Sequence, residues 1–235
     1  MNRDNPFDPV NIVGGGGGGN DISDTNLVGY WKFDEGSGNT ANDSSTNGNN
    51  GTISTATWTT GKYGNALNFN NNGTVIVPHS SSLNIGSNFT IISCVYLRSA
   101  GWSPTILAKG ENSNYKIGFY AGTKKYYFTY YSNGSWRDMV GGTDTILSLS
   151  QWYYVATIVD VLNNQIKYYI DGTLADTING NFTANPLVTN TGNLEIGHRT
   201  NGEYINGIID EVRIYNRAFN SSEISTDYKK CINIQ

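Results

Sequence analysis

The sequence contains few charged residues, and their balance argues against one large class of partner. Aspartate, glutamate, lysine and arginine together make up 14% of the 235 residues, and the formal net charge is −4. A nucleic-acid interface needs clustered Lys and Arg to neutralise phosphates. A charge set this sparse and weakly acidic therefore predicts no nucleic-acid partner.

Cysteine and histidine are also scarce. The two cysteines, Cys94 and Cys231, cannot build a disulfide framework, although a single bond between them stays open. Cys94 lies in an apolar run, where it is expected to be a small buried residue. The two histidines, His79 and His198, lie near neither a Cys nor a Ser in a nucleophile-elbow motif. Neither a nucleophilic triad nor a zinc site is expected.

Long apolar runs are missing as well. No run of about 18 apolar residues is present, so no membrane insertion is expected. The N-terminal MNRDNPFDPVNIV also lacks the basic region and apolar core of a standard secretory signal peptide. Residues 1–26 include six consecutive glycines, a flexible tether that packs no core. Two interpretations of this leader stay open: a disordered segment, or a docking peptide that mounts the domain 27–235 on something larger.

Turn formers and β-formers dominate the remainder of the chain. The sequence holds 28 glycines and 16 tyrosines, and from Leu27 onward apolar β-formers come in short runs. The runs are LVGYWKF, TVIVP, FTIISCVYL, TILAKG, YKIGFY, KYYFTYY, WYYVATIV, QIKYYI, GNLEIG and GIIDEVRIY. With SWRDMV and TLADTI, which follow two of these runs after short turns, the chain has more than ten short strands. Without a βαβ alternation they predict an all-β fold, a two-sheet antiparallel sandwich.

Local signals place the turns and one helix. Asn133-Gly134 and Asp171-Gly172 are strong signals for two-residue hairpin turns. The segment NSSEISTDYKKCI predicts a short C-terminal helix, in which Asn220 is the N-cap and Glu223 completes a capping box.

Three sequence segments carry a resemblance to a known family, in the family's order and spacing. They are LVGYWKFDEGSGNTANDSSTNGNNGT at 27–52, GKYGNALNF at 61–69 and NGIIDEVRIYNRAFNSSEI at 206–224. Together they resemble the LamG-like jelly-roll domain, the laminin G domain 3 group of the concanavalin A-like lectin/glucanase superfamily. The resemblance covers about residues 27 to 225 and implies a jelly-roll sandwich. It implies less about function, because this fold hosts lectins, adhesion modules, enzymes and structural domains.

The last predicted strand carries two adjacent carboxylates. Strand alternation puts Asp210 on the face of Ile208 and Val212, and it puts Glu211 on the opposite face with Arg213. We expect Glu211 to serve the surface with Arg213. A buried carboxylate such as Asp210 must be paired, protonated or bound to a metal.

A calcium site is one way to satisfy that carboxylate. Ca²⁺ takes about six to eight oxygen ligands, and the loop that follows WKF is acidic. Similar jelly-roll families often carry one Ca²⁺ that ties the two chain ends together. By that resemblance we expect a structural calcium held by Asp34, Asp43 and Asp210, with Glu35 or Asn47 as a further ligand. The alternative is that these groups only cap turns and accept backbone N–H bonds.

Catalysis is not expected. Family 16 laminarinase-type glycoside hydrolases, which share the resembled fold, place acid and nucleophile as Glu-x-Asp-x-Glu on one strand face. No glutamate of this chain begins that motif. We therefore predict no catalytic residues, and a glycoside hydrolase is only a third interpretation.

Ligand binding is expected from aromatic side chains near polar ones. A sugar site needs aromatic faces for the C–H groups and planar polar groups for the hydroxyls. Alternate residues of 126–131 fall on opposite faces, so one set forms core and the other forms a platform near a predicted hairpin. The alternative is that these tyrosines are good β-formers without a ligand. The predicted ligand-binding residues are Trp102, Trp136, Arg137, His198, Arg199 and Tyr204.

The leading hypothesis is a non-catalytic recognition or adhesion module that binds carbohydrate or another cell-surface ligand. The alternative is a virion-associated protein, a capsid decoration or fibre, that displays this domain through residues 1–26 docked on a capsid or fibre protein. Both hypotheses predict an extracellular or virion-surface location.

Overall fold

The computed structural model describes residues 24–110, 114–199 and 202–232. The glycine tether and the predicted docking peptide lie outside the described residues. The side chain of Cys231 lies outside them as well, so its pairing with Cys94 stays open.

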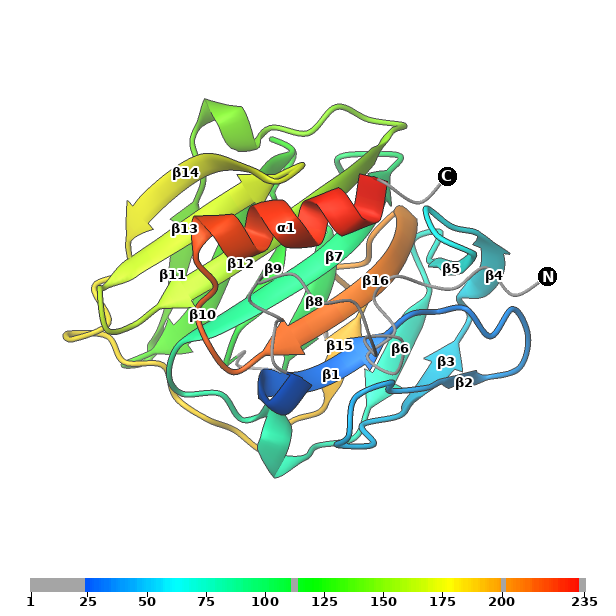
Figure 1. Ribbon diagram of the computed structural model, residues 1–235, viewed down its shortest axis with the longest axis horizontal. Helices are drawn as coiled ribbons and strands as arrows, with labels where there is room; N and C mark the ends of the chain where they lie inside the picture. Colours follow the sequence, from blue (N-terminus) through cyan, green and yellow to red (C-terminus); the bar gives the residue numbers. More distant parts are fainter. Residues whose placement is uncertain (1–23, 111–113, 200–201, 233–235) are drawn as a thin grey trace, which may run out of the picture.

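The described strands form two antiparallel sheets of eight strands each, stacked face to face (Figure 1). The first, here called the covered sheet, has the order β14-β13-β12-β7-β16-β5-β4, and β1 pairs with β16. Its strands are β14 Thr173–Asn179, β13 Gln165–Ile170, β12 Trp152–Asp160, β7 Phe89–Leu97, β16 Gly207–Tyr215, β5 Asn65–Asn68, β4 Thr57–Thr60 and β1 Leu27–Trp31.

The second sheet, here called the open sheet, has the order β11-β10-β9-β8-β15-β6-β3-β2. Its strands are β11 Ser135–Val140, β10 Lys125–Ser132, β9 Lys116–Tyr120, β8 Thr105–Lys109, β15 Leu194–Ile196, β6 Thr74–Val77, β3 Gly51–Ser54 and β2 Thr40–Ala41. Short 3₁₀ turns stand at η2 Asp24–Asn26, η3 Ser81–Leu83 and η4 Thr143–Thr145. The predicted all-β jelly-roll sandwich is confirmed.

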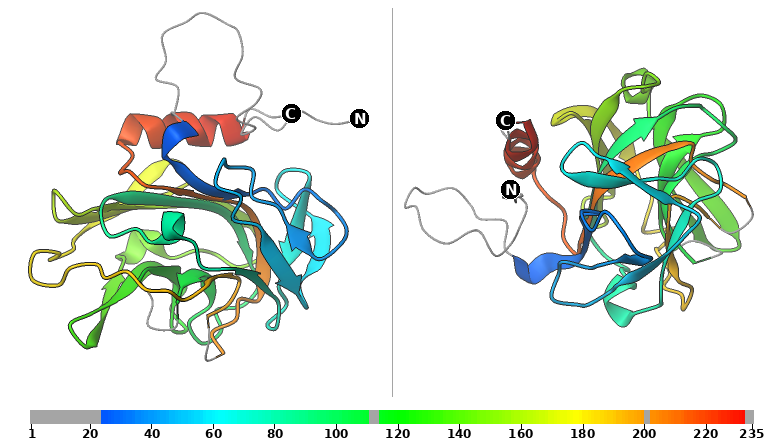
Figure 2. Two further views of the ribbon diagram at one scale, coloured as in Figure 1. Left: turned by 90° about the horizontal axis from the view of Figure 1, so that it is seen from below. Right: turned by 90° about the vertical axis from the view of Figure 1, so that its right-hand side faces the viewer.

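The helix α1, Ser221–Ile232, lies across the outer face of the covered sheet, so the two sheets and the helix form three layers (Figure 2). A main apolar core fills the space between the sheets, and a smaller one lies beneath α1. None of the helices in the described part of the chain has the length and apolar character of a membrane span.

Tyrosines supply much of the core and keep their hydroxyls satisfied there. Tyr115, Tyr126 and Tyr168 have no exposed surface. The Tyr115 hydroxyl donates to the Leu83 carbonyl at 3.0 Å, and the Tyr126 hydroxyl accepts from Thr157 Oγ1 at 2.9 Å. Such bonds remove most of the cost of burying a hydroxyl, so each ring contributes its large apolar area to the core.

The predicted turns and helix cap are confirmed. Asn133-Gly134 joins β10 to β11 and Asp171-Gly172 joins β13 to β14, and all of these residues have positive φ, as a type I′ turn requires. At the start of α1, the Asn220 N–H donates to Glu223 Oε2 at 2.8 Å. The Glu223 N–H donates to Asn220 Oδ1 at 3.0 Å, which completes the capping box.

Replacing Asn220 by alanine is expected to lower the free energy of unfolding by about 1 kcal/mol, because the Glu223 N–H loses its acceptor. Urea denaturation measures this difference. Ser222→Ala, on the exposed side of the same first turn, is the matched control. Equal stabilities for the two variants would contradict a capping role for Asn220.

The last strand departs from the predicted alternation. A β-bulge interrupts β16 between Asp210 and Arg213, and Glu211 has a φ of 56°. The extra residue puts Asp210 opposite Cys94 and Arg213 opposite Ile92, two residues of β7 that pack in the core beneath α1. The expectation that Asp210 shares a face with Val212 is therefore wrong.

The expectation of a surface role for Glu211 and Arg213 is also wrong. Glu211 has no exposed surface, Arg213 is 1% exposed, and the Tyr30 hydroxyl donates to Glu211 Oε2 at 2.5 Å. Arg213 Nη1 lies 2.7 Å from Asp227 Oδ1 of α1. The bulge thus places Glu211 against Tyr30 of β1 and Arg213 against α1, with both side chains buried.

Candidate ligand-binding site

A pocket of about 290 Å³ lies on the outer face of the open sheet, over β9, β10 and β11. Strand register builds its floor. Thr129 of β10 stands opposite Lys116 of β9 on one side and opposite Asp138 of β11 on the other. Because directly paired residues share a face, these three side chains form one row across three strands.

Two loops complete the pocket. Trp102 and Ser103 come from the loop before β8, and Arg199 and Glu203 come from the loop after β15. The lining residues are Trp102, Ser103, Lys116, Tyr120, Ala121, Tyr127, Thr129, Trp136, Asp138, Arg199 and Glu203.

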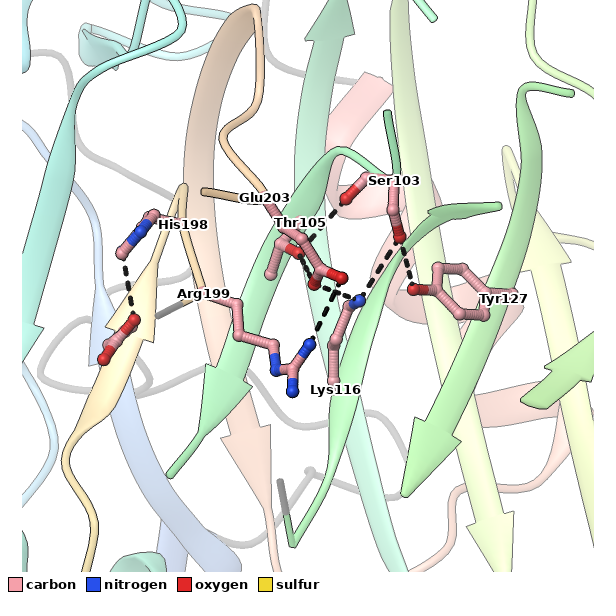
Figure 3. A network of polar contacts seen from close by, with 8 residues as sticks. Ser103, Thr105, Lys116, Tyr127, His198, Arg199 and Glu203 are labelled. Atoms are coloured by element: carbon pink, nitrogen blue, oxygen red, sulfur yellow. Dashed lines mark hydrogen bonds and ion pairs between the residues drawn. The ribbon is translucent and has the colours of Figure 1, made fainter. Parts of the chain in front are cut away.

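A connected polar network holds the two loops against the sheet (Figure 3). Glu203 Oε2 lies 2.5 Å from Lys116 Nζ, and Glu203 Oε1 lies 3.2 Å from Arg199 Nη1. Lys116 Nζ also donates to Ser103 Oγ at 3.3 Å, and Ser103 Oγ shares a 2.9 Å hydrogen bond with the Tyr127 hydroxyl. Glu203 is therefore the carboxylate that bridges both cations of the pocket.

Electrostatics make this bridge necessary. Lys116 is 2% exposed, and burial lowers its pKa, an effect that the Glu203 carboxylate opposes. Burying an ammonium group without a partner costs several kcal/mol of folding free energy, and the Glu203 carboxylate supplies that partner to Lys116. The polar wall of the pocket is consequently fixed before any ligand arrives.

Aromatic rings form the other walls. The Arg199 guanidinium lies 4.3 Å from the centre of the Trp136 ring, and Tyr131 contacts the same ring edge-on at 5.3 Å. Tyr120 and Tyr127 meet edge-on at 5.6 Å. Trp102 is 79% exposed at the rim.

The sequence match decides the family. Residues 69–225 match the family profile described as the concanavalin A-like lectin/glucanases superfamily. The chain belongs to this superfamily. No relative among curated proteins matches the sequence.

Solved structures agree on the concanavalin A-like fold. The binding domain of Paraclostridial Mosquitocidal Protein 1 superposes with a TM-score of 0.73 at 20% identity, over 89% of this chain and 53% of that one. Domain 4 of AbnA, a GH43 extracellular arabinanase from Geobacillus stearothermophilus in complex with arabinotriose, gives 0.69 at 23% identity, over 85% and 97%. The binding domain of Botulinum Neurotoxin DC in complex with SialylT gives 0.66 at 17% identity, over 90% and 52%.

These likenesses differ in extent. The chain spans about half the length of the two toxin binding domains and nearly all of the arabinanase domain. At these identities the likeness establishes the concanavalin A-like fold.

The pocket of the concanavalin A-like domain unites half of the predicted ligand-binding residues. Trp102, Trp136 and Arg199 line it. His198 and Tyr204 stack on each other at 4.1 Å instead, outside the pocket lining.

His198 and Arg137 have other neighbours. His198 Nδ1 lies 3.0 Å from Glu195 Oε2, a pair that stands apart from the main network (Figure 3). Arg137 is registered opposite Tyr130, whose ring packs in the core between the sheets. Its side chain therefore leaves on the other face of β11 from Trp136 and Asp138.

The predicted ligand-binding residues include Arg199 but omit the other polar residues of the pocket. Sheet register brings together Lys116, Tyr127 and Asp138 from three neighbouring strands, and Glu203 reaches them from the loop after β15. One signal was available. The Asn133-Gly134 turn fixes the pairing of β10 with β11, which places Asp138 beside Thr129 on the outer face.

The predicted calcium ligands do not gather into one site. Both oxygens of Asp43 are engaged: Oδ1 accepts from the Tyr30 and Ser45 N–H groups, each at 2.8 Å. Oδ2 accepts from Ser45 Oγ at 2.7 Å and from the Asn49 N–H at 2.8 Å. Asn47 turns its amide nitrogen toward the Leu27 carbonyl at 3.1 Å. These two residues behave as turn caps.

Asp34 and Asp210 lie on either side of the 61–65 loop. Asp34 Oδ1 accepts from the Asn65 N–H at 3.1 Å, and Asp210 Oδ2 accepts from the Tyr63 N–H at 3.0 Å. Asp210 Oδ1 is buried without a hydrogen-bond partner. Burial, and next the Glu211 carboxylate, raise the pKa of Asp210 well above its ordinary range, which favours the protonated acid.

Glu35 completes the predicted set, and its Oε2 is buried without a hydrogen-bond partner. Its Oε1 accepts from the Asn42 N–H at 2.7 Å. Across the described ranges, no group of three or more His, Cys, Asp and Glu side chains is arranged to hold a metal ion. The five residues do not fit a single calcium as a set, and calcium binding by this chain stays a prediction.

Proposed function

We propose that this concanavalin A-like domain is a recognition module that binds carbohydrate in the pocket of the open sheet. The observation that carries the proposal is the pairing of aromatic faces with a fixed polar network in one open pocket. Aromatic rings suit the C–H faces of a sugar, and prearranged polar groups orient its hydroxyls at little entropic cost.

The likeness to known domains supports the proposal. The arabinanase domain, which this chain matches over most of both lengths, was solved with arabinotriose. The toxin structures are binding domains, one of them in complex with SialylT. The fold is therefore used for ligand recognition in proteins of similar architecture.

The arrangement of Glu203 favours binding over hydrolysis. Both of its oxygens contact cationic donors, Lys116 Nζ and Arg199 Nη1. A general acid has to deliver a proton to a glycosidic oxygen, and a carboxylate with both oxygens held by cationic side chains is not free to reach one. We therefore propose a module without catalytic residues.

A sugar-binding module acts where glycans are displayed, outside a cell or on a virion surface. Attachment to a capsid or fibre protein depends on residues 1–26, most of which lie outside the described residues, and it stays a prediction.

The affinity of the Trp136→Ala variant for carbohydrate is expected to be at least roughly tenfold lower than that of the wild type, because the ring forms a pocket wall. A glycan array identifies the ligand, and isothermal titration calorimetry with that oligosaccharide measures the affinity. Trp102→Ala, which removes an exposed ring at the rim, is expected to act in the same direction.

Leu162→Ala is the control, because Leu162 is 87% exposed in the turn between β12 and β13 and does not line the pocket. Melting temperatures show whether each variant is folded. Unchanged affinity in both tryptophan variants would move the site elsewhere on the domain.

A further inference from the structure

The charged groups of the pocket balance one another. The charged residues that line it are Lys116, Arg199, Glu203 and Asp138. Two cations and two carboxylates sum to a net charge of zero. The balance is local as well as formal, because Glu203 contacts Lys116 at 2.5 Å and Arg199 at 3.2 Å.

Neither cation is presented to an incoming anion. The side chains of Lys116 and Arg199 are 3% and 12% exposed, and the Arg199 guanidinium also lies over the Trp136 ring. A ligand carboxylate would have to displace Glu203 from both partners. A ligand carboxylate that left Glu203 in place would add a third negative charge to the pocket, beside Glu203 and Asp138. Like charges this close to one another repel.

Two oxygen-bearing side chains of the pocket stay outside the charged network, and both suit hydroxyls. Asp138 is exposed, and it forms no ion pair among the described residues. A carboxylate accepts hydrogen bonds from two neighbouring hydroxyls of a sugar ring. Beside it in the row, Thr129 Oγ1 is buried and has no partner in the described chain.

We propose that the pocket selects uncharged sugars and rejects acidic ones, and that Glu203 is the residue that sets this selectivity. Uronic and sialic acids carry the carboxylate that the pocket excludes. The inference rests on the proposed function, since it specifies which carbohydrates enter the same pocket.

The test compares neutral oligosaccharides with uronic acid oligosaccharides of the same ring stereochemistry and length, for example galactose against galacturonic acid oligomers. The comparison uses the matched pair that shows measurable binding to the full-length wild type. The affinity for its neutral member is expected to be at least about tenfold higher than the affinity for its acidic member. In Glu203→Gln the ratio of the neutral to the acidic affinity is expected to fall toward one or below it. The change leaves two cations, Lys116 and Arg199, with Asp138 as the one carboxylate of the pocket lining. Glu195→Gln is the matched control, since Glu195 pairs with His198 outside the pocket lining.

The outcomes separate the two proposals. If neither member of any pair binds, the proposed function fails. If sugars bind through Trp136 but the wild type prefers the acidic member, the selectivity inference is overturned and the proposed function stands. If the wild type prefers neutral sugars and folded Glu203→Gln keeps the same ratio, the role of Glu203 is overturned. The wild-type ratio needs no variant, so a misfolded Glu203→Gln leaves the selectivity testable.

Discussion

Raising the pH above about 10 is expected to unfold this protein steeply. Tyr30, Tyr115, Tyr126, Tyr127 and Tyr168 are all buried, and burial is the largest of the causes that raise the pKa of each above the ordinary value of 10.0. In the unfolded chain the same phenols ionise near that value. The native state therefore holds protons that the unfolded state releases.

The sign follows from this difference. A group whose folded pKa is raised contributes stability that is fully present below its unfolded pKa and is lost as the pH rises beyond it. Each such tyrosine costs about 1.4 kcal/mol per pH unit above about 10. Five together reach roughly 7 kcal/mol per unit, comparable with the whole free energy of unfolding of a typical domain.

Urea denaturation at a series of pH values between about 9 and 11 measures this slope. Tyr115→Phe is expected to lower the slope by about 1.4 kcal/mol per pH unit, because it removes one titrating group. Tyr120→Phe, which removes a more exposed phenol, controls for the substitution itself. Gradual appearance of tyrosinate absorbance in a protein that stays folded would contradict the prediction.

Breaking the ion pair beneath α1 is expected to produce the second large effect. Arg213 Nη1 and Asp227 Oδ1 lie 2.7 Å apart with both side chains 2% exposed. The Tyr154 hydroxyl donates to the other oxygen of Asp227 at 2.8 Å. Asp227→Asn removes the charge that compensates a buried guanidinium, and loss of one partner of such a pair costs about 3–5 kcal/mol.

Urea denaturation and the melting temperature measure this loss. Asp144→Asn, an identical change at an exposed position, is the matched control and is expected to be nearly neutral. A double-mutant cycle with Arg213→Met and Asp227→Leu isolates the pair, and the double variant is expected to recover about 1 kcal/mol or more relative to the sum of the single changes. Additive effects would show that the contact contributes no coupling.

The architecture was predictable because its signals are local and repeated. Alternating β-formers mark strands, and Asn133-Gly134 and Asp171-Gly172 mark hairpins by the positive φ that each turn requires. The capping box of Asn220 and Glu223 spans only four residues. Each of these features is decided by residues that adjoin one another in the chain.

The bulge in β16 was not predictable by the same reasoning. Strict alternation assumes regular pairing, and one extra residue in the left-handed region at Glu211 reverses the face of every residue beyond it. Glutamate is not a residue that signals positive φ. Contacts with Tyr30 and with the helix hold this conformation, and neither contact is encoded near Glu211 in the sequence.

The candidate site was predictable only in part. Trp102 and Trp136 could be predicted from their positions in or beside turns, whereas the contact of Lys116 with Glu203 joins residues 87 positions apart. Asp43 shows why the calcium prediction has an alternative, because a loop aspartate that is suited to calcium is equally suited to the backbone N–H groups around it.

The layering of the sandwich makes its two outer faces different, because α1 covers one of them and the pocket lies on the other (Figure 2). The described chain begins at η2 and ends with α1, and both lie on the outer side of the covered sheet (Figure 2). The pocket opens on the opposite side, over β9, β10 and β11. Both ends of the described chain therefore lie on the side away from the pocket (Figure 2), and a domain held on a surface at these two points would turn the pocket outward.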